Sequence, residues 1–291
     1  MPGCLSRIPH PCRMPILNHE QNAPRACCWP VMTRSGDMRR DCRFYDNIAP
    51  GGGGLVVAWG SLQIVKDAIF DDNHATGRDT TFGGGGIWHT ADSRSYLYNV
   101  VLRRNSAFSG GGFFNSETTA GGVIVMENVS ISDNIARVHG GGGFFSLVSV
   151  RLYLVRFTNN TAKNGAGVVF DSGSSATMHS CFFIHNKARL NGGAVLGNGQ
   201  DTVIRASLTK VELSSALNEG AGIYLSGAAT MGLNDSFITA CIAGKHGGGA
   251  YVPVTDCVCV CVCVRPCFCA GVFIYIQSYM HIRTISAIIT P

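Results

Sequence analysis

The chain has 291 residues with a formal net charge of +5, and 14% of its residues are charged. The excess positive charge lies in the flanks, because residues 41–256 carry 15 Lys plus Arg against 16 Asp plus Glu. This balance does not favour a nucleic-acid partner. Eleven of the 13 cysteines also lie in the flanks, at or before Cys42 and after Asp256, so the sequence does not indicate a disulfide-stapled domain.

Residues 1–40 are rich in Pro, Cys and Arg and contain no repeat. A secretory signal needs a run of about 7–15 apolar residues, and Pro9, Pro11 and Pro15 interrupt each such run near the start. We expect an irregular, disordered leader or a start placed too early on a longer gene. The alternative is a short cap over the first coil of a repeat array.

A repeat begins at Asp41 and is clearest in Phe157 to Gly167, which has the skeleton F-x-x-N-x-A followed by a glycine step. The marking asparagine recurs at intervals of 26 to 32 residues, with Ser214 and Cys241 in the degenerate copies. The glycine steps are Gly51, Gly83, Gly110, Gly140, Gly165, Gly192, Gly220 and Gly247. A period of this length is typical of a solenoid, so residues 41–255 are predicted to be one repeat domain.

Each repeat contains alternating apolar residues before the asparagine and a second short apolar run after the glycine step. Alternation at period two predicts half-buried strands. The core stack is expected three residues before each asparagine, at Phe44, Phe70, Leu102, Ile131, Phe157 and Phe183. No crossover helix is indicated, so successive coils are predicted to stack as a parallel β-helix of about eight coils.

The marking asparagines are Asn47, Asn73, Asn105, Asn134, Asn160 and Asn186. Residues at one corner of successive coils lie above one another, and an amide side chain both donates and accepts hydrogen bonds. The asparagine column is therefore predicted to be an inward structural ladder.

The segments Phe183 to Asn186 and Gly192 to Val195 resemble the paired F-x-x-N and G-G-A-I repeats of polymorphic outer membrane proteins. Those proteins are similar to the wider group of right-handed parallel β-helices, the pectin-lyase-like proteins. The resemblance implies an all-β fold, a single right-handed β-helix solenoid with irregular flanks. It also implies a secreted or cell-surface module that adheres to glycans or surface proteins.

The alternative function is a polysaccharide lyase or hydrolase, which needs clustered carboxylates on neighbouring coils. The second position after the glycine step holds Val56, Trp88, Phe114, Phe145, Val169, Val195, Tyr224 and Tyr251. The third position holds Val57, His89, Asn115, Ser146, Phe170, Leu196, Leu225 and Val252. Neither column carries a carboxylate, so an enzyme is the less favoured interpretation.

Five charged residues before the asparagine column are the weak catalytic candidates, namely Asp71, Asp72, Arg103, Arg104 and Asp133. Opposite charges one coil apart predict a surface ion-pair ladder of little energetic value. A groove between the long turns at 74–82 and 115–122, lined by these residues, would favour the enzyme. The sequence predicts no metal site and no cofactor, because the glycine runs lead into strands and are not phosphate-binding loops.

Three N-x-S/T sequences mark Asn128, Asn159 and Asn234 as N-glycosylation acceptors in a secreted chain. The tail at 256–291 begins with a strict Cys-Val repeat that a TG dinucleotide tract would encode. Alternatives are an edge strand with thiols that bind a soft metal, or a membrane span that Arg265-Pro266 cuts below the roughly 20 residues required. We expect no further coil here, so the last coil would expose edges open to end-to-end self-association.

Overall fold

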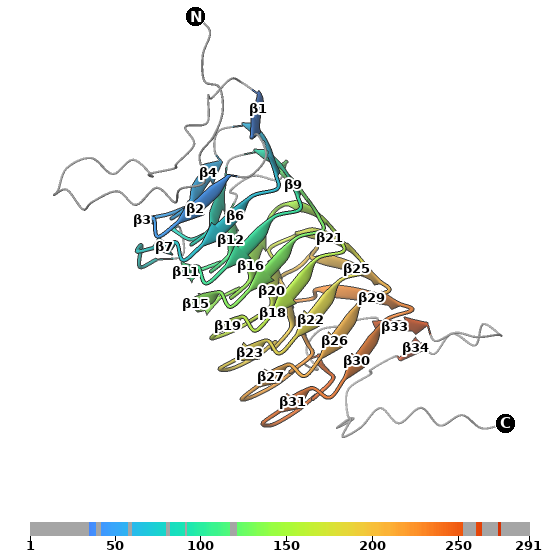
Figure 1. Ribbon diagram of the computed structural model, residues 1–291. Helices are drawn as coiled ribbons and strands as arrows, with labels where there is room; N and C mark the ends of the chain where they lie inside the picture. Colours follow the sequence, from blue (N-terminus) through green and yellow to red (C-terminus); the bar gives the residue numbers. More distant parts are fainter. Residues whose placement is uncertain are drawn as a thin grey trace, which may run out of the picture.

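The computed structural model describes residues 35–38, 42–57, 60–79, 82–90, 92–116, 121–252, 260–263 and 273–274. Every regular element within these residues is a β-strand, from β1 (Ser35–Met38) to β34 (Phe273–Ile274). The strands stack into a rod in which each turn of the chain lies on the one before it (Figure 1). The predicted all-β parallel β-helix is confirmed.

The rod has four sheets, which we call A to D in the order that the chain visits them. Sheet A contains β1, β5 (Leu62–Lys66), β9 (Arg94–Tyr98), β13 (Val123–Glu127), β17 (Ser149–Tyr153), β21 (Ser175–His179), β25 (Val203–Ser207), β29 (Thr230–Asn234), β33 (Val260–Cys263) and β34. Sheet B contains β2 (Arg43–Tyr45), β6 (Ile69–Asp71), β10 (Val101–Arg103), β14 (Ser130–Ser132), β18 (Arg156–Thr158), β22 (Phe182–Ile184), β26 (Lys210–Glu212) and β30 (Phe237–Thr239).

Sheets C and D complete each coil. Sheet C contains β3 (Ile48–Ala49), β7 (His74–Ala75), β11 (Ser106–Ser109), β15 (Ile135–His139), β19 (Thr161–Ala162), β23 (Lys187–Ala188), β27 (Ser215–Ala216) and β31 (Ile242–Ala243). Sheet D contains β4 (Leu55–Val57), β8 (Ile87–His89), β12 (Phe113–Ser116), β16 (Gly143–Ser146), β20 (Val168–Asp171), β24 (Val195–Asn198), β28 (Ile223–Ser226) and β32 (Ala250–Tyr251). Seven turns of the chain therefore separate the first and eighth strands of sheets B, C and D.

Both flanks contribute to sheet A. Within the leader, β1 pairs in parallel with β5. Within the Cys-Val repeat, β33 pairs in parallel with β29, and β34 then pairs with β33 in the antiparallel sense. The other expectations for residues 1–34 and for most of the tail lie outside the described residues.

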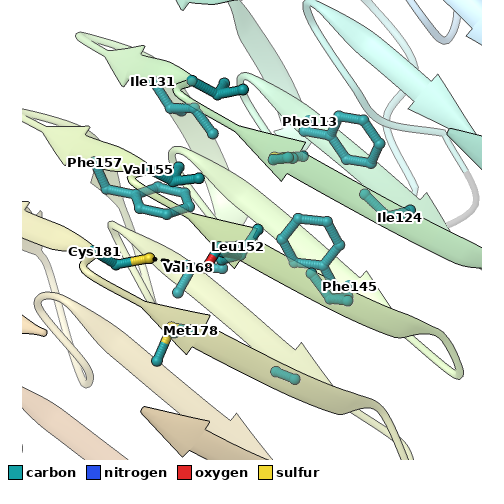
Figure 2. Packing of buried hydrophobic residues seen from close by; sticks show 14 of the residues in the cluster. Phe113, Ile124, Ile131, Phe145, Leu152, Val155, Phe157, Val168, Met178 and Cys181 are labelled. Atoms are coloured by element: carbon teal, nitrogen blue, oxygen red, sulfur yellow. Dashed lines mark hydrogen bonds between the residues drawn. The ribbon is translucent and has the colours of Figure 1, made fainter. Parts of the chain in front are cut away.

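The interior is filled by side chains that stack from coil to coil. The six predicted core-stack residues, Phe44 to Phe183, are 0–2% exposed. The rings of Phe157 and Phe183 lie 4.8 Å apart and parallel within 1°. Figure 2 shows Phe113 and Phe145 one above the other in the core. They come from different positions of neighbouring sheet D strands, and their ring centroids lie 5.4 Å apart with the ring planes tilted by 27°. Because parallel strands repeat about every 4.8 Å, identical positions in successive coils place aromatic rings at stacking distance.

The six asparagines form one continuous buried ladder between sheets B and C. Asn134 illustrates the pattern, because its Nδ2 donates to the carbonyl oxygen of Leu102 at 2.9 Å and to Oδ1 of Asn160 at 3.1 Å. Its backbone N–H donates to the same Oδ1 at 3.0 Å. All the amide side chains from Asn47 to Asn186 take part. The ladder does not reach the next coil, where Ser214 Oγ donates to the backbone oxygen of Glu212 in its own coil.

The predicted register is wrong in two coils of sheet D. The glycine with positive φ is Gly52 in the first coil and Gly84 in the second, one residue after the start of the glycine step, and it is the first glycine of the step in the other six coils. In sheet D, Phe144 and Leu196 occupy the outward second position in place of Phe145 and Val195, and the third position moves with them. The outward second position lies four residues after the positive-φ glycine, as at Phe144 after Gly140 and Leu196 after Gly192, and the predicted column departed from this spacing in those two coils. The corrected columns still carry no carboxylate.

Candidate functional site

The corner that follows sheet B carries the charged residues predicted as weak catalytic candidates. This corner turns at one residue per coil, with φ between 50° and 57°, and that residue points outward. The corner residues are Asp46, Asp72, Arg104, Asp133, Asn159, His185, Leu213 and Ala240. Asp and Asn tolerate this left-handed conformation better than most residues, so the acidic and amide side chains here have a conformational reason.

Asp71 lies at the centre of an ion cluster. Arg104 donates from Nε to Asp71 Oδ1 at 2.9 Å and from Nη2 to Oδ2 at 2.7 Å, while Arg103 Nη2 donates to Oδ2 at 2.9 Å. Partial burial alone would raise the pKa of Asp71, but the hydrogen bonds and charges of both arginines outweigh burial and lower it. A carboxylate clamped in this way is a poor proton carrier at neutral pH.

The other two acidic candidates have different partners. Asp72 Oδ1 lies 3.5 Å from Nε2 of His74. Asp133 Oδ1 accepts a hydrogen bond of 2.6 Å from Nδ2 of Asn159. The structure therefore does not assemble the acidic candidates into one pair of facing carboxylates, as glycoside hydrolysis requires.

A line of three side chains on this corner was missed in the sequence. His74 Nδ1 lies 2.7 Å from Ser106 Oγ, and its Nε2 faces Asp72. A hydroxyl, an imidazole and a carboxylate in series is the arrangement of a nucleophile, its base and an orienting group. The sequence contained a signal for the contact between His74 and Ser106, because each of them directly follows a ladder asparagine and the two therefore occupy the same position in neighbouring coils. A second pair, His179 Nδ1 and Ser207 Oγ at 2.8 Å, shows that column stacking brings His and Ser together elsewhere too.

The outward face of sheet A gathers tyrosines and basic residues. Strand pairing aligns three outward columns here. The middle column is Ile64, Tyr96, Val125, Arg151, Thr177, Arg205 and Gly232, and the column nearest sheet B is Lys66, Tyr98, Glu127, Tyr153, His179, Ser207 and Asn234. Lys66 Nζ lies 5.9 Å from the ring centroid of Tyr98. From β5 to β29 the face has four Lys or Arg side chains, with Arg94 in the first column, against the acidic Glu127, and in β1 Asp37 pairs with Ile64 of the middle column.

Two shallow hollows lie beside this face. One, of about 230 Å³, is lined by residues of three coils, including Asn99, Asn128 and Arg156. The other, of about 260 Å³, lies near Gly121, Leu147 and Gly173. Neither is lined by an acidic residue.

The three N-glycosylation acceptor asparagines are all exposed. Nδ2 of Asn128 donates to Asn99 Oδ1 at 2.8 Å, and Nδ2 of Asn234 donates to Asp235 Oδ2 at 3.2 Å. Asn159 is bonded to Asp133, as described above. Each amide nitrogen therefore lies on the surface, in a short polar contact with a neighbour.

A polar pair inside the core was also missed. His89 and Asn115 occupy the third position of sheet D in neighbouring coils, and both are 0% exposed. Asn115 Nδ2 lies 3.1 Å from His89 Nδ1, and Asn115 Oδ1 accepts from the backbone N–H of Ser146 at 3.1 Å. Burial lowers the pKa of His89 to about 4, although a backbone hydrogen bond at Ser93 opposes the shift. The imidazole is therefore neutral at physiological pH.

No family model, curated protein or solved structure matches this chain. Among the described residues, no group of three or more His, Cys, Asp or Glu side chains is placed to hold a metal ion. No helix in the same residues is long and apolar enough to cross a membrane.

Proposed function

We propose that the chain is a non-enzymatic interaction module, secreted or on a cell surface, that binds glycans or proteins through the outward face of sheet A. The observation that carries the proposal is the alignment of Tyr96, Tyr98 and Tyr153 with Arg151 and Arg205 on one face. Tyrosine and arginine are the side chains that most often dominate binding energy at interfaces. Guanidinium groups also suit carboxylate or sulfate groups on a partner.

The position of these side chains adds to the argument. They stand on regular strands whose inward residues, such as Ile124, Leu152 and Met178, are 0% exposed. A rigid support lowers the entropy lost on binding. The basic balance of the face, in a repeat region that is otherwise near neutral, favours an acidic partner such as an anionic polysaccharide.

The test is binding of the full chain to matched acidic and neutral polysaccharides. The double variant Arg151→Ala with Arg205→Ala should weaken binding to the acidic polymer by about a hundredfold, since each of the two lost charge-assisted contacts is worth about 1.5 kcal/mol. The control, Lys163→Ala with Lys187→Ala, removes two exposed positive charges from the side of sheet C. Equal binding by the two double variants would refute the proposed face.

The secreted or surface location rests on the resemblance of the repeats to polymorphic outer membrane proteins and the pectin-lyase-like group. Exposure of the acceptor asparagines is compatible with it. Expression through a eukaryotic secretory pathway should produce a glycan on Asn128 that Asn128→Gln removes. Antibody labelling of intact source cells tests the location itself, and labelling only after permeabilisation would contradict it.

A second candidate function is a hydrolase, and the line of Asp72, His74 and Ser106 is the observation that favours it. Of the acidic residues first considered for a polysaccharide lyase or hydrolase, Asp71 is tied to Arg103 and Arg104, and Asp133 is tied to Asn159. Asp72 instead faces His74. Hydrolysis of acylated polysaccharides that is lost in Ser106→Ala and His74→Ala, but kept in Ser207→Ala, would support the enzyme. Identical rates of hydrolysis in the three variants would rule out the hydrolase.

A further inference from the structure

The two ends of the rod differ in how well their inward side chains are covered. In the first coil, Cys42, Phe44, Leu55 and Val57 are 2–7% exposed. In the last coil, the inward residues Ile238, Cys241, Ala250 and Val252 are only partly buried against the core. The N-terminal cross-section is thus already withdrawn from solvent, and the C-terminal cross-section is not.

Exposed apolar side chains also gather at the C-terminal end. Among the described residues, nine large hydrophobic side chains are exposed, and five of them belong to the last two coils. These five are Leu208 at 51%, Leu213 at 48%, Leu217 at 65%, Phe237 at 63% and Ile242 at 72% exposure. Exposed large apolar side chains are thus concentrated toward this end of the rod, and apolar surface that gathers in one region often marks an interaction site.

The backbone at this end also offers edges for pairing. β30, β31 and β32 are the last strands of sheets B, C and D in the described part of the chain, and Figure 1 shows β30 and β31 at the orange end of the rod. Sheet A continues for two more strands and finishes with the antiparallel β34. A strand edge without a covering strand is a template for another chain.

We propose that this C-terminal end is a docking surface for the same end of a second copy, so that two rods meet tail to tail about a two-fold axis. In a two-fold dimer the same surface of each copy forms the contact, so that surface must be complementary to itself. An apolar surface meets this requirement because apolar side chains pack against other apolar side chains. Residues 237–252 contain no Asp or Glu and only Lys245 as a fully charged side chain, so little charge opposes the contact. Head-to-tail stacking is disfavoured because the N-terminal core side chains are already covered.

The proposal is independent of the function proposed for sheet A, but it has a consequence for it. A two-fold dimer would present two copies of the sheet A face. Two linked faces bind a repetitive polymer with higher avidity than one.

The test is the mass of the full chain in solution, measured by light scattering and sedimentation in a reducing agent, so that the 13 cysteines cannot cross-link the copies. We expect a species of twice 30.9 kDa that dissociates on dilution. Ile242→Glu should shift it to monomer. Ile242 is an exposed residue, so the substitution should leave the circular dichroism of the rod unchanged. Leu217→Glu, also at an exposed position, provides a second variant with the same expected outcome.

Ile48→Glu is the matched control. Ile48 lies in the same outward column of sheet C as Ile242, at the opposite end of the rod, and is 64% exposed. The dimer should persist in this variant. Loss of association in Ile48→Glu as well, or a series of growing oligomers, would show head-to-tail stacking and overturn the proposal. A monomer at all concentrations would show that no second copy covers the C-terminal end of the rod. That result would also overturn the proposed dimer.

Discussion

The first six coils and the last two follow the same path, but their interiors differ. Coils one to six contain the asparagine ladder and the stack of Phe, Leu and Ile that begins at Phe44. In coils seven and eight, Ser214 and Cys241 replace the asparagine, and Val211 and Ile238 occupy the stack. Parallel strand pairing nevertheless continues through all eight coils in sheets B, C and D. Backbone pairing therefore suffices to continue the rod, and the side-chain columns determine how firmly each coil is held.

The largest contrast between the two regions should come from the core stack. Phe157→Ala removes a ring that is 0% exposed and stacked on Phe183, so it should lower the free energy of unfolding by about 3–5 kcal/mol. Ile238→Ala, in the same column of the last coil, should cost about 1 kcal/mol, because its side chain is only partly buried. Denaturant titration of both variants measures the difference. Equal losses would mean that the last coil is packed as tightly as the middle of the rod.

The ladder provides the second contrast. Asn160→Ala removes four hydrogen bonds, two accepted from the backbone N–H and Nδ2 of Asn134 and two donated to Ile131 and Asn186. Buried groups left without partners should make the loss about 3 kcal/mol. Ser214→Ala breaks one hydrogen bond within its own coil and should cost about 1 kcal/mol. Exposed Lys163→Ala is the control, and a loss in Asn160→Ala no larger than in the control would contradict the ladder's role.

The fold was predictable because its determinants repeat. The same residue types recur in columns, so one misread coil does not change the conclusion, and the columns of Phe44 and Asn47 indicated the inward side directly. The glycine runs were the weak point, since four consecutive glycines allow several positions for one positive-φ turn. Once the positive-φ glycine is known, the register of sheet D follows at a fixed spacing of four residues, as from Gly140 to Phe144 and from Gly192 to Leu196.

The candidate sites were harder to predict because they depend on side-chain conformations across coils. The charged column before the ladder was found, but the double clamp of Asp71 by Arg103 and Arg104 requires the two arginine side chains to turn toward one carboxylate. The sheet A face was accessible in principle, since its residues occupy the polar positions between the core columns. Its tyrosines are recognised as one surface only when the outward positions are aligned coil by coil.

Acid should weaken the rod through His89, which lies among the first six coils. The pKa of His89 is about 4 in the folded chain, against 6.5 for an ordinary histidine. The unfolded chain therefore binds a proton between these values when the folded chain does not, so stability is fully present above pH 6.5 and is lost as the pH falls toward 4. At pH 5 the loss should be about 2 kcal/mol. His89→Gln should flatten the profile of unfolding midpoint against pH in this range, and an unchanged profile would assign the acid sensitivity elsewhere.

The smallest effect should come from the ion cluster on the outer corner, although it has the most visible contacts. Asp71 receives three hydrogen bonds from Arg103 and Arg104, but both arginine side chains are about half exposed, at 44% and 57%. Water and salt screen such pairs, and Arg103 can still hold the carboxylate if Arg104 is removed. Arg104→Ala should therefore lower the unfolding free energy by less than any of the changes above, and by less still at high salt. Lys187→Ala, an exposed side chain on sheet C, is the control. A loss in Arg104→Ala that approaches that of Asn160→Ala would mean that surface charge, and not the buried amide column, holds these coils together.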